Sequence, residues 1–357
     1  MRTVFLTACF ALFGSTSGLA FEEPHPSPVV ETSADLDGRD PTKPSLRIQT
    51  RIDNGAWSSR RAISPLKGQR VTLRTKPVEG GDPRWFAIFA DLTRNYANAN
   101  TPWEEDPYEW RGVEEIGYAR VEIPSGRGRW EISPFDEMET VLEALLKRLG
   151  SENRDERTFS FYRSDAGTFW FQVEVETDGR LLRSHGIEDR GPRGLSRKVT
   201  RVTVRDGEGL TGHVTGFYNV PGVFGSLLSQ SVNRVGADCA DVLMAAWSSW
   251  KKRKLTKNHN VQMMVTRFEK RATISMEGGV ADEELKWGVD VHPGDFIAVH
   301  YGEEGRKYHH VGALWSDADG DGVLGSGDLV IHAGPYPLHL SRLDRRVFDG
   351  RVVILSP

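Results

Sequence analysis

Short segments in which apolar and polar residues partly alternate dominate the chain from residue 45 to residue 206. They are rich in β-branched and aromatic residues, as half-buried strands are, and read SLRIQTRI, RVTLRT, RWFAIFAD, ARVEI, TFSFYRS, TFWFQVEVE and KVTRVTVR. Gly80-Gly81, Ser125–Gly128 and Asp178-Gly179 supply turns between them. The pattern predicts a β-sandwich of immunoglobulin-like character over residues 45–206.

One helix interrupts these strands, between Asp136 and Leu149. Apolar residues recur there at helical spacing, after an acidic start that suits a helix N-terminus. They are Met138, Val141, Leu142, Leu145 and Leu149. We expect this stripe to face the core of the sandwich.

The pattern changes from residue 209 onward. A loop rich in Gly, Pro and Ser over residues 218–231 leads into an apolar helix that begins near Asp238. Strands follow at FIAVH, HHVGALW, DLVIHAG and RVVIL. One helix packed on a small antiparallel sheet is an α+β arrangement. The chain is therefore predicted to be α+β overall, with a second domain over residues 209–357.

Residues 1–20 have the features of a cleaved signal peptide. A basic second residue and an apolar stretch precede Gly18-Leu19-Ala20, a small-residue cleavage site. Residues 21–44 are rich in Pro, Ser, Thr and Asp, which predicts a flexible linker. No later segment approaches the roughly 18 apolar residues of a membrane helix. We expect secretion to the periplasm or the extracellular space without a membrane span. Lipid attachment at Cys9 is a minor alternative, because only a short apolar stretch precedes it.

Composition and charge narrow the classes of function. The formal net charge is −4, with 38% hydrophobic and 27% charged residues, as in ordinary globular proteins. A general nucleic-acid binder would show a basic excess. The basic run at residues 251–254 suits the solvated end of a helix. Nucleic acid is therefore not an expected partner.

Cys239 is the one cysteine that remains if the leader, with Cys9, is removed. A single thiol cannot form an internal disulfide, and a buried core cysteine is the simple alternative. However, Asp238 is a natural N-cap, which places Cys239 in the first turn of a helix. The positive end of a helix stabilises a thiolate and lowers the thiol pKa. Free amides of that turn could also bind a developing oxyanion. We therefore interpret Cys239 as a candidate nucleophile.

Two histidines downstream can complete a catalytic arrangement. His310 opens the apolar strand of residues 310–314, from which an imidazole can reach a cysteine across a helix–sheet interface and take its proton. His332 lies on the next apolar segment. A polar group there could hydrogen-bond the far nitrogen of the base and fix its tautomer.

These segments together resemble the NlpC-type papain-like cysteine peptidases of bacterial cell walls. The matching motifs, in family order, are Asp238-Cys239, Pro293-Gly294-Asp295-Phe296, His310-Val311-Gly312 and Ile331-His332-Ala333. The resemblance covers residues 209–357 and implies a papain-like fold with the unpermuted order of cysteine before histidine. It also implies Cys239 as nucleophile, His310 as base, His332 as the orienting third residue, and peptidoglycan stem peptide as substrate. A transglutaminase-like order of Cys, His and Asp fits the strands poorly.

The chain departs from this family around the nucleophile. Ala240-Asp241 stands where members commonly have Ser-Gly. Their aromatic approach to the cysteine is only loosely matched by Tyr218 and by Val223–Gly225. Such positions shape substrate binding, and we take Tyr218 and Asp238 as candidate substrate-binding residues.

An acidic loop of twelve residues lies between the two histidine strands. Asp317, Asp319, Asp321 and Asp328 occupy loop positions 1, 3, 5 and 12, with Gly322 at position 6. This spacing surrounds Ca²⁺ with oxygens, position 7 offering the Val323 carbonyl. Asp in place of Glu at position 12 resembles dockerin-type loops. We expect a structural Ca²⁺ that orders the histidine strands; an ordinary Asp/Gly turn is the alternative.

Aromatic residues in the N-terminal half leave a second binding role open. Trp103, Tyr108 and Trp110 could form a platform for a sugar, although aromatic residues of sandwiches more often pack in the core.

The sequence as a whole predicts a secreted cysteine peptidase or amidase that cleaves amide bonds, in peptides or in cell-wall stem peptides. The rival prediction is a noncatalytic wall- or glycan-binding protein on a papain-like scaffold.

Overall fold

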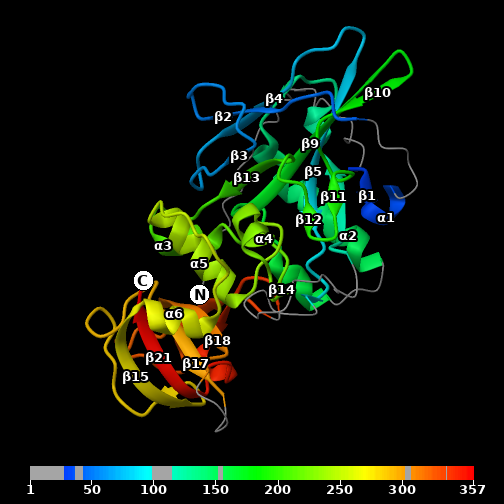
Figure 1. Ribbon diagram of the computed structural model, residues 1–357. Helices are drawn as coiled ribbons and strands as arrows, with labels where there is room; N and C mark the ends of the chain where they lie inside the picture. The colour runs from blue at the N-terminus through cyan, green and yellow to red at the C-terminus, as the bar shows by residue number, and fades with distance from the viewer. Residues whose placement is uncertain (1–27, 37–42, 99–114, 152–155, 302–306, 335) are drawn as a thin grey trace, which may run out of the picture.

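The computed structural model describes residues 28–36, 43–98, 115–151, 156–301, 307–334 and 336–357. These residues form an α+β structure, as predicted. We call the part up to residue 207 the N-terminal lobe, residues 208–268 the helical layer, and residues 269–357 the C-terminal lobe. Figure 1 shows the helical layer between the sheets of the two lobes.

The N-terminal lobe contains a mixed seven-stranded sheet. Its order is β1 (Val30–Thr32), β7 (Tyr118–Glu122), β5 (Asp82–Ala90), β9 (Gly167–Thr177), β13 (Thr200–Val204) and β3 (Ala62–Ile63), and β10 (Arg180–Arg183) also pairs with β9. All of these pairs are antiparallel except β13 with β3. A three-stranded sheet contains β2 (Gln49–Ile52), β4 (Val71–Arg74) and β8 (Glu131–Ile132), and contributes to the same hydrophobic core.

Helix α2 (Met138–Ser151) packs into this core with the predicted stripe. The side chains of Met138, Val141, Leu142, Leu145 and Leu149 are all buried. The helix prediction is therefore confirmed. It follows the 3-10 turn η2 (Pro134–Glu137), and a further turn, η1 (Pro124–Gly126), precedes β8.

Two predictions for the N-terminal half are wrong. Residues 30–36, expected in a linker, form strand β1 and the short helix α1 (Ser33–Leu36), because β1 pairs with the edge of β7 and Leu36 is buried. The segment TFSFYRS, expected as a strand, starts in the 3-10 helix η3 (Glu156–Phe161). There Phe159 and Phe161 pack against the core from a tight turn. Alternating aromatic residues suit both arrangements, so periodicity could not separate them.

The C-terminal lobe is an antiparallel seven-stranded sheet. Its order is β16 (Val280–Ala281), β15 (Glu269–Glu277), β21 (Gly350–Ser356), β17 (Phe296–His300), β18 (His310–Ser316), β19 (Leu329–His332) and β20 (His339–Arg342). The four central strands are those expected from sequence. Strands β15, β16 and β20 were not expected, since their exposed or polar residues carry little apolar pattern.

Both faces of this sheet are covered, as the strand β17 illustrates. Phe296 and Ala298 belong to the core shared with the helical layer, whereas Ile297 and Val299 belong to a second core under loops of the lobe. Alternation along a strand sends successive side chains to opposite faces. A strand covered on both faces reads as a continuous apolar run, as FIAVH does.

The helical layer consists of α3 (Leu210–Thr215), α4 (Leu228–Asn233), α5 (Cys239–Trp250) and α6 (Val261–Arg267). Helix α5 is almost wholly buried from Ala240 to Trp247 and packs against β18. Between α3 and α4, strand β14 (Val223–Phe224) pairs in parallel with β6 (Tyr96–Ala97) of the N-terminal lobe. None of the helices in the described part of the chain is both long and apolar enough for a membrane span.

Candidate active site

Cys239 is the first residue of α5, as the sequence predicts. Asp238 precedes it in extended conformation, and its carboxylate accepts a hydrogen bond from the Asp241 amide at 2.9 Å. This is an N-cap interaction, in which a side-chain oxygen accepts a hydrogen bond from an otherwise unpaired amide of the first helical turn. The cap fixes Cys239 at the point where α5 faces β18.

His310 and His332 lie side by side on adjacent strands. Gly312 of β18 is paired with His332 of β19. The Nε2 atom of His310 and the Nδ1 atom of His332 are 3.0 Å apart, and both rings are buried. The structure therefore brings the predicted base and its predicted partner into hydrogen-bond contact.

Ser341 extends this contact into a chain of three side chains. The Nε2 atom of His332 lies 2.8 Å from the Ser341 hydroxyl on β20. If His310 Nε2 donates to His332 Nδ1, His332 must carry its own proton on Nε2 and donate it to Ser341. The Nδ1 atom of His310 is then left as the basic nitrogen.

Cys239, His310 and His332 line one cavity of about 640 Å³. Its other lining residues include Phe224, Tyr301, Tyr336, His339, Ser341, Arg345 and Arg346. In the described residues no hydrogen bond joins the Cys239 sulfur to the His310 ring. Even so, the amide of Val311, next to His310, is among the groups that act on the pKa of Cys239. The sulfur thus lies against the start of the histidine strand.

The thiol pKa differs from the sequence prediction. Burial raises the pKa of Cys239, the negative charge of Asp238 raises it further, and the amides of Val311 and Ala240 only partly lower it. The predicted lowering by the helix terminus is therefore outweighed. Burial also lowers the pKa of His310 to about 4, with a contribution from His339. At neutral pH the resting pair is a thiol and a neutral imidazole.

Two buried carboxyl groups lie beside the nucleophile. Ser226 donates to Asp241 Oδ2 at 2.5 Å and accepts from the Asp238 amide at 3.0 Å. Burial raises the pKa of Asp238 to about 6, and burial and the neighbouring Asp238 raise that of Asp241 well above its usual value. Asp241 stands where the resembled family has glycine, so this pair is a feature of this chain.

Tyr218 does not line the cavity. It follows α3, its side chain is buried, and its ring lies 5.4 Å from the Arg163 guanidinium. The structure therefore does not bring Tyr218 together with Cys239 in this cavity, to which the loop between the two residues contributes Val223 and Phe224 instead. Asp238, the other expected residue, does line it.

Several cavity residues were not foreseen from sequence. Tyr301 stacks on His309, and its hydroxyl donates to the Val347 carbonyl at 2.5 Å. His339 packs on His332 with ring centroids 4.3 Å apart. The only available signal was the position of these residues at the ends of strands that flank the two predicted histidines.

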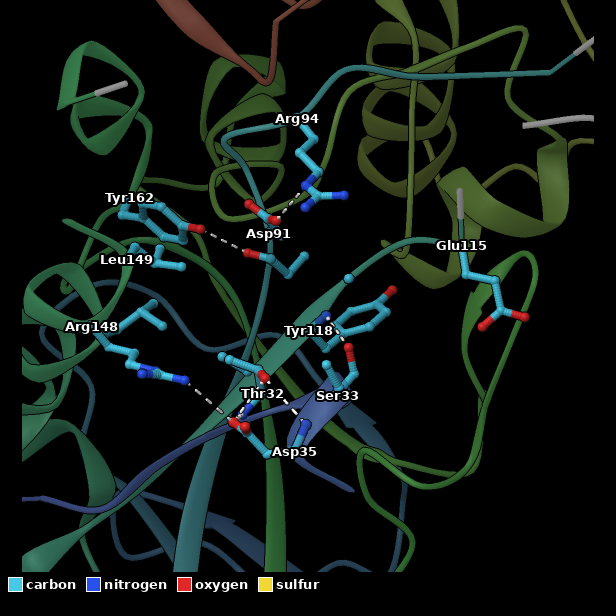
Figure 2. A pocket seen from close by; sticks show the side chains of 15 residues that line it. Thr32, Ser33, Asp35, Asp91, Arg94, Glu115, Tyr118, Arg148, Leu149 and Tyr162 are labelled. Atoms are coloured by element: carbon cyan, nitrogen blue, oxygen red, sulfur yellow. Dashed lines mark hydrogen bonds and ion pairs between the residues drawn. The ribbon is translucent and has the colours of Figure 1, made fainter. Parts of the chain in front are cut away.

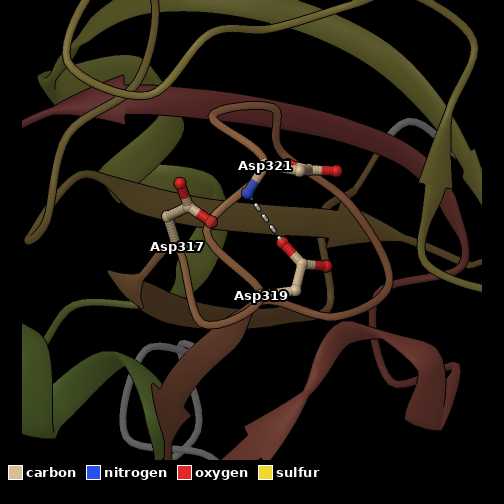
Figure 3. A group of neighbouring side chains, drawn as sticks. All are labelled: Asp317, Asp319 and Asp321. Atoms are coloured by element: carbon tan, nitrogen blue, oxygen red, sulfur yellow. Dashed lines mark hydrogen bonds between the residues drawn. The ribbon is translucent and has the colours of Figure 1, made fainter.

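Three carboxylates of the acidic loop lie together, as Figure 3 shows for Asp317, Asp319 and Asp321. One oxygen of each lies within 4.8 Å of the others. The loop is folded by hydrogen bonds from the amides of Gly320 and Gly322 to Asp317, and both glycines have positive φ. A set of exposed oxygen donors at this spacing suits a hard cation such as Ca²⁺.

Asp328 is not part of that cluster. It is fully buried, and its oxygens accept from the Trp287 indole at 2.8 Å and from the amides of Ala318 and Gly325. Asp328 therefore anchors the base of the loop rather than joining the three carboxylates. Val323, the expected carbonyl ligand, lies opposite Lys286 in an isolated antiparallel bridge, and its amide donates to Asp321 Oδ1 at 2.8 Å.

A separate cavity of about 420 Å³ lies in the N-terminal lobe, between β1, β7 and α2 (Figure 2). Two ion pairs lie in its lining, Arg148 with Asp35 at 3.8 Å and Arg94 with Asp91 at 3.4 Å. The predicted sugar platform of Trp103, Tyr108 and Trp110 lies outside the described residues.

Searches of the chain against protein-family models, curated proteins and solved structures find no match. The chemistry of the site therefore has to be inferred from the residues and their geometry.

Proposed function

We propose that the protein is a secreted cysteine hydrolase that cleaves amide bonds with a papain-like C-terminal domain. One observation carries the proposal: the 3.0 Å contact of His310 Nε2 with His332 Nδ1, in the cavity that Cys239 lines. A histidine with one nitrogen held by a partner has its other nitrogen free for proton transfer. The resemblance of the motifs to NlpC-type peptidases supports the same assignment.

The reaction begins from a neutral pair. His310, with its pKa of about 4, accepts the thiol proton of Cys239 as the sulfur attacks the substrate carbonyl carbon. The Cys239 amide, at the open end of α5, is placed to donate to the developing oxyanion. Protonated His310 then gives its proton to the departing amine. Water, deprotonated by the same imidazole, hydrolyses the thioester and restores the thiol.

The substrate in this proposal is a peptide, in particular a peptidoglycan stem peptide. The exposed aromatic rings of Phe224 and Tyr336 and the cations Arg345 and Arg346 line the cavity. These groups suit a chain that carries both apolar and carboxylate groups. In the same proposal the N-terminal lobe is an immunoglobulin-like sandwich that contacts wall glycan, and the leader directs secretion.

The loop carboxylates Asp317, Asp319 and Asp321 hold a structural Ca²⁺ in this proposal. The ion would neutralise three neighbouring negative charges on the connection between β18 and β19, which carry the two histidines. It takes no part in the chemistry.

Purified peptidoglycan incubated with the mature protein tests the proposal, with fragments identified by mass spectrometry. We expect new stem-peptide termini from the wild type and none from Cys239→Ala. His292→Ala, a histidine outside the cavity, is the matched control and should cleave as the wild type does. Intact peptidoglycan in the presence of folded wild-type protein, at several pH values, would refute the assignment of substrate.

The second candidate function is a noncatalytic wall- or glycan-binding protein on the same scaffold. The raised pKa of the partly buried Cys239 thiol favours it, because little of such a thiol is present as the reactive thiolate at neutral pH. Labelling with iodoacetamide near pH 6 separates the two. Labelling of Cys239 that is lost in His310→Ala supports the enzyme, whereas labelling only at alkaline pH and independent of His310 supports the binding protein.

A further inference from the structure

A third cavity lies at the junction of the N-terminal lobe and the helical layer. Its volume is about 330 Å³. Its lining includes Arg201 of β13, Arg205 directly after that strand, His213 of α3, and Arg234, the C-cap residue of α4. Three arginine residues therefore line one small space.

Arg234 is the most deeply buried of the three, with 6% of its surface exposed. Its guanidinium carbon lies 3.5 Å above the centre of the Phe217 ring, which holds it in place by a cation–π contact. Its Nη1 atom is buried and has no hydrogen-bond partner. Buried guanidinium donors are rarely left in this state, because each unsatisfied donor costs free energy.

The neighbouring arginines show the same lack of partners. The Nε atoms of Arg201 and Arg205 are also buried without a hydrogen-bond acceptor. The remaining contacts of Arg201 and Arg205 are to neutral groups: the carbonyls of Val232, Gly207 and Ser64, and the His213 ring.

Counter-charge is missing from the described lining of the cavity. None of its described residues is acidic. Burial lowers the pKa of Arg201 to about 10, and burial with repulsion from Arg201 lowers that of Arg234 well below its usual value. Only Arg205 has a nearby carboxylate, Glu208, that raises its pKa, and Glu208 does not line the cavity. At neutral pH the three guanidinium groups stay charged and repel one another.

His213 is consistent with this electrostatic environment. Burial and the charges of Arg205 and Arg234 lower its pKa to about 4. The ring is therefore neutral, and its Nε2 atom, 2.9 Å from Arg205 Nη1, accepts a hydrogen bond from that arginine. His213 thus positions Arg205 without adding charge to the cavity.

We propose that this cavity is a binding site for a phosphate group, either as free phosphate or carried on a small molecule. Planar guanidinium groups match the oxygens of a tetrahedral oxyanion and bind them with charge-assisted hydrogen bonds. A doubly charged oxyanion compensates three converging cations better than a single carboxylate does. The site is independent of the proposed active site and shares no lining residue with the cavity of Cys239.

Binding of inorganic phosphate to the mature protein tests the proposal, by calorimetry and by thermal unfolding against sodium chloride of equal ionic strength. We expect a saturable rise in Tm with phosphate that chloride does not reproduce. Arg234→Gln should weaken phosphate binding at least about tenfold. Arg197→Gln, an exposed arginine near the same sheet, should bind as the wild type does. A phosphate response equal to that of chloride, or unchanged in Arg234→Gln, would overturn the proposal.

Loss of folding in a variant can be separated from loss of the ligand. Without phosphate, Arg234→Gln should unfold at the same temperature as the wild type or higher, because it removes an uncompensated buried charge. If it unfolds lower, Arg205→Gln, at a less buried position, must still weaken phosphate binding for the proposal to stand. Glycerol 3-phosphate and vesicles of phosphatidylglycerol distinguish the sources. Arg234-dependent binding of the first assigns a soluble phosphate, and Arg234-dependent co-sedimentation with the second assigns a lipid headgroup.

Discussion

The N-terminal lobe and the start of α5 both bury ionisable side chains, but they do so in opposite ways. In the lobe, Arg120 is 3% exposed and is paired with Glu174, and with Glu31 at 2.7 Å. Glu122, equally buried, is paired with Arg84 at 2.7 Å and Arg127 at 2.8 Å. Each of these two buried charges has an opposite charge in contact with it.

Around α5 the buried groups have no such partners in the described structure. Burial raises the pKa values of Asp238 and Asp241 and lowers those of His310 and His332, so every shift favours the neutral form. A buried ion pair stabilises the fold, whereas a buried ionisable group that is neutral can take up or release a proton. The proposed function places proton transfer at α5, where such neutral groups lie, and the charge pairs of the lobe stabilise the fold.

Replacement of the base should have the largest effect. His310→Ala removes the only proton acceptor that we assign to Cys239, and kcat for amide cleavage should fall about 10³-fold. Kinetics on a fluorogenic stem-peptide analogue measure this, with His292→Ala as control. Activity within a few fold of the wild type would show that the buried histidines are structural, and the comparison would fail.

Among the effects on stability, we expect the largest from disruption of a buried ion pair. Arg120→Met leaves the buried carboxylate of Glu174 without its ion-pair partner and should lower the free energy of unfolding by about 3–5 kcal/mol. Urea unfolding measures it. The exposed pair of Lys67 and Asp165, 2.6 Å apart, provides the contrast, since Lys67→Met should cost at most about 1 kcal/mol.

The buried carboxyl group of Asp238 predicts an unusual dependence of stability on pH. Asp238 ionises near 3.8 when unfolded and near 6 when folded, so between these values the folded chain holds a proton that the unfolded chain has lost. Stability from this group is therefore full below about pH 4 and falls as pH rises to about 6, by up to about 3 kcal/mol. Asp238→Asn, which keeps the cap, should remove this fall. The lowered pKa of His310 makes stability change with pH in the opposite direction. Asp238→Asn must therefore be compared with the wild type at each pH.

Binding of Ca²⁺ should change the free energy of unfolding by an amount similar to that of the Asp238 carboxyl, or smaller. With free Ca²⁺ about 100-fold above Kd, stability should rise by about 2.7 kcal/mol, and chelation should reverse this rise. Asp319→Asn should weaken the response, whereas Asp344→Asn, on an exposed carboxylate outside the cluster, should not. Identical melting curves of the wild type with and without Ca²⁺ would remove the metal from the proposal.

Ser341→Ala should have the smallest effect. It removes one hydrogen bond from His332, 2.8 Å away, and such a bond contributes about 1 kcal/mol. We expect kcat to fall roughly 5-fold, with KM unchanged, because the serine acts through the two histidines. A loss as large as that of His310→Ala would give Ser341 a more direct role.

Structural features that depend on residues adjacent in the sequence could be predicted. The start of α5 at Cys239, the strands of His310 and His332, and the stripe of α2 all follow from local patterns, and the structure has each of them. The sequence could not predict Ser341 or the three arginines of the third cavity. Those residues come from separate elements, and only tertiary packing brings them together.

Electrostatics was the least predictable property for the same reason. The sequence correctly placed Cys239 at a helix terminus, but the sign of its pKa shift depends on how deeply the sulfur is buried and on the charge of Asp238. The sequence shows that Asp238 precedes the cysteine, but the depth of burial of both residues depends on tertiary packing. The polar composition of residues 30–36 hid strand β1 in a similar way, since this strand pairs with the edge of β7, far along the chain.

The parallel pairing of β14 with β6 makes the two halves of the chain interdependent. The Asn98 amide donates to the Phe224 carbonyl at 3.0 Å, and Phe161 stacks on Tyr336 with ring centres 5.8 Å apart. Phe224 and Tyr336 both form walls of the cleft that holds Cys239. A fragment that starts after residue 207 would consequently lose the contacts that support Phe224 and Tyr336. Replacement of the N-terminal lobe by another domain would therefore change the shape of the cavity that Cys239 lines.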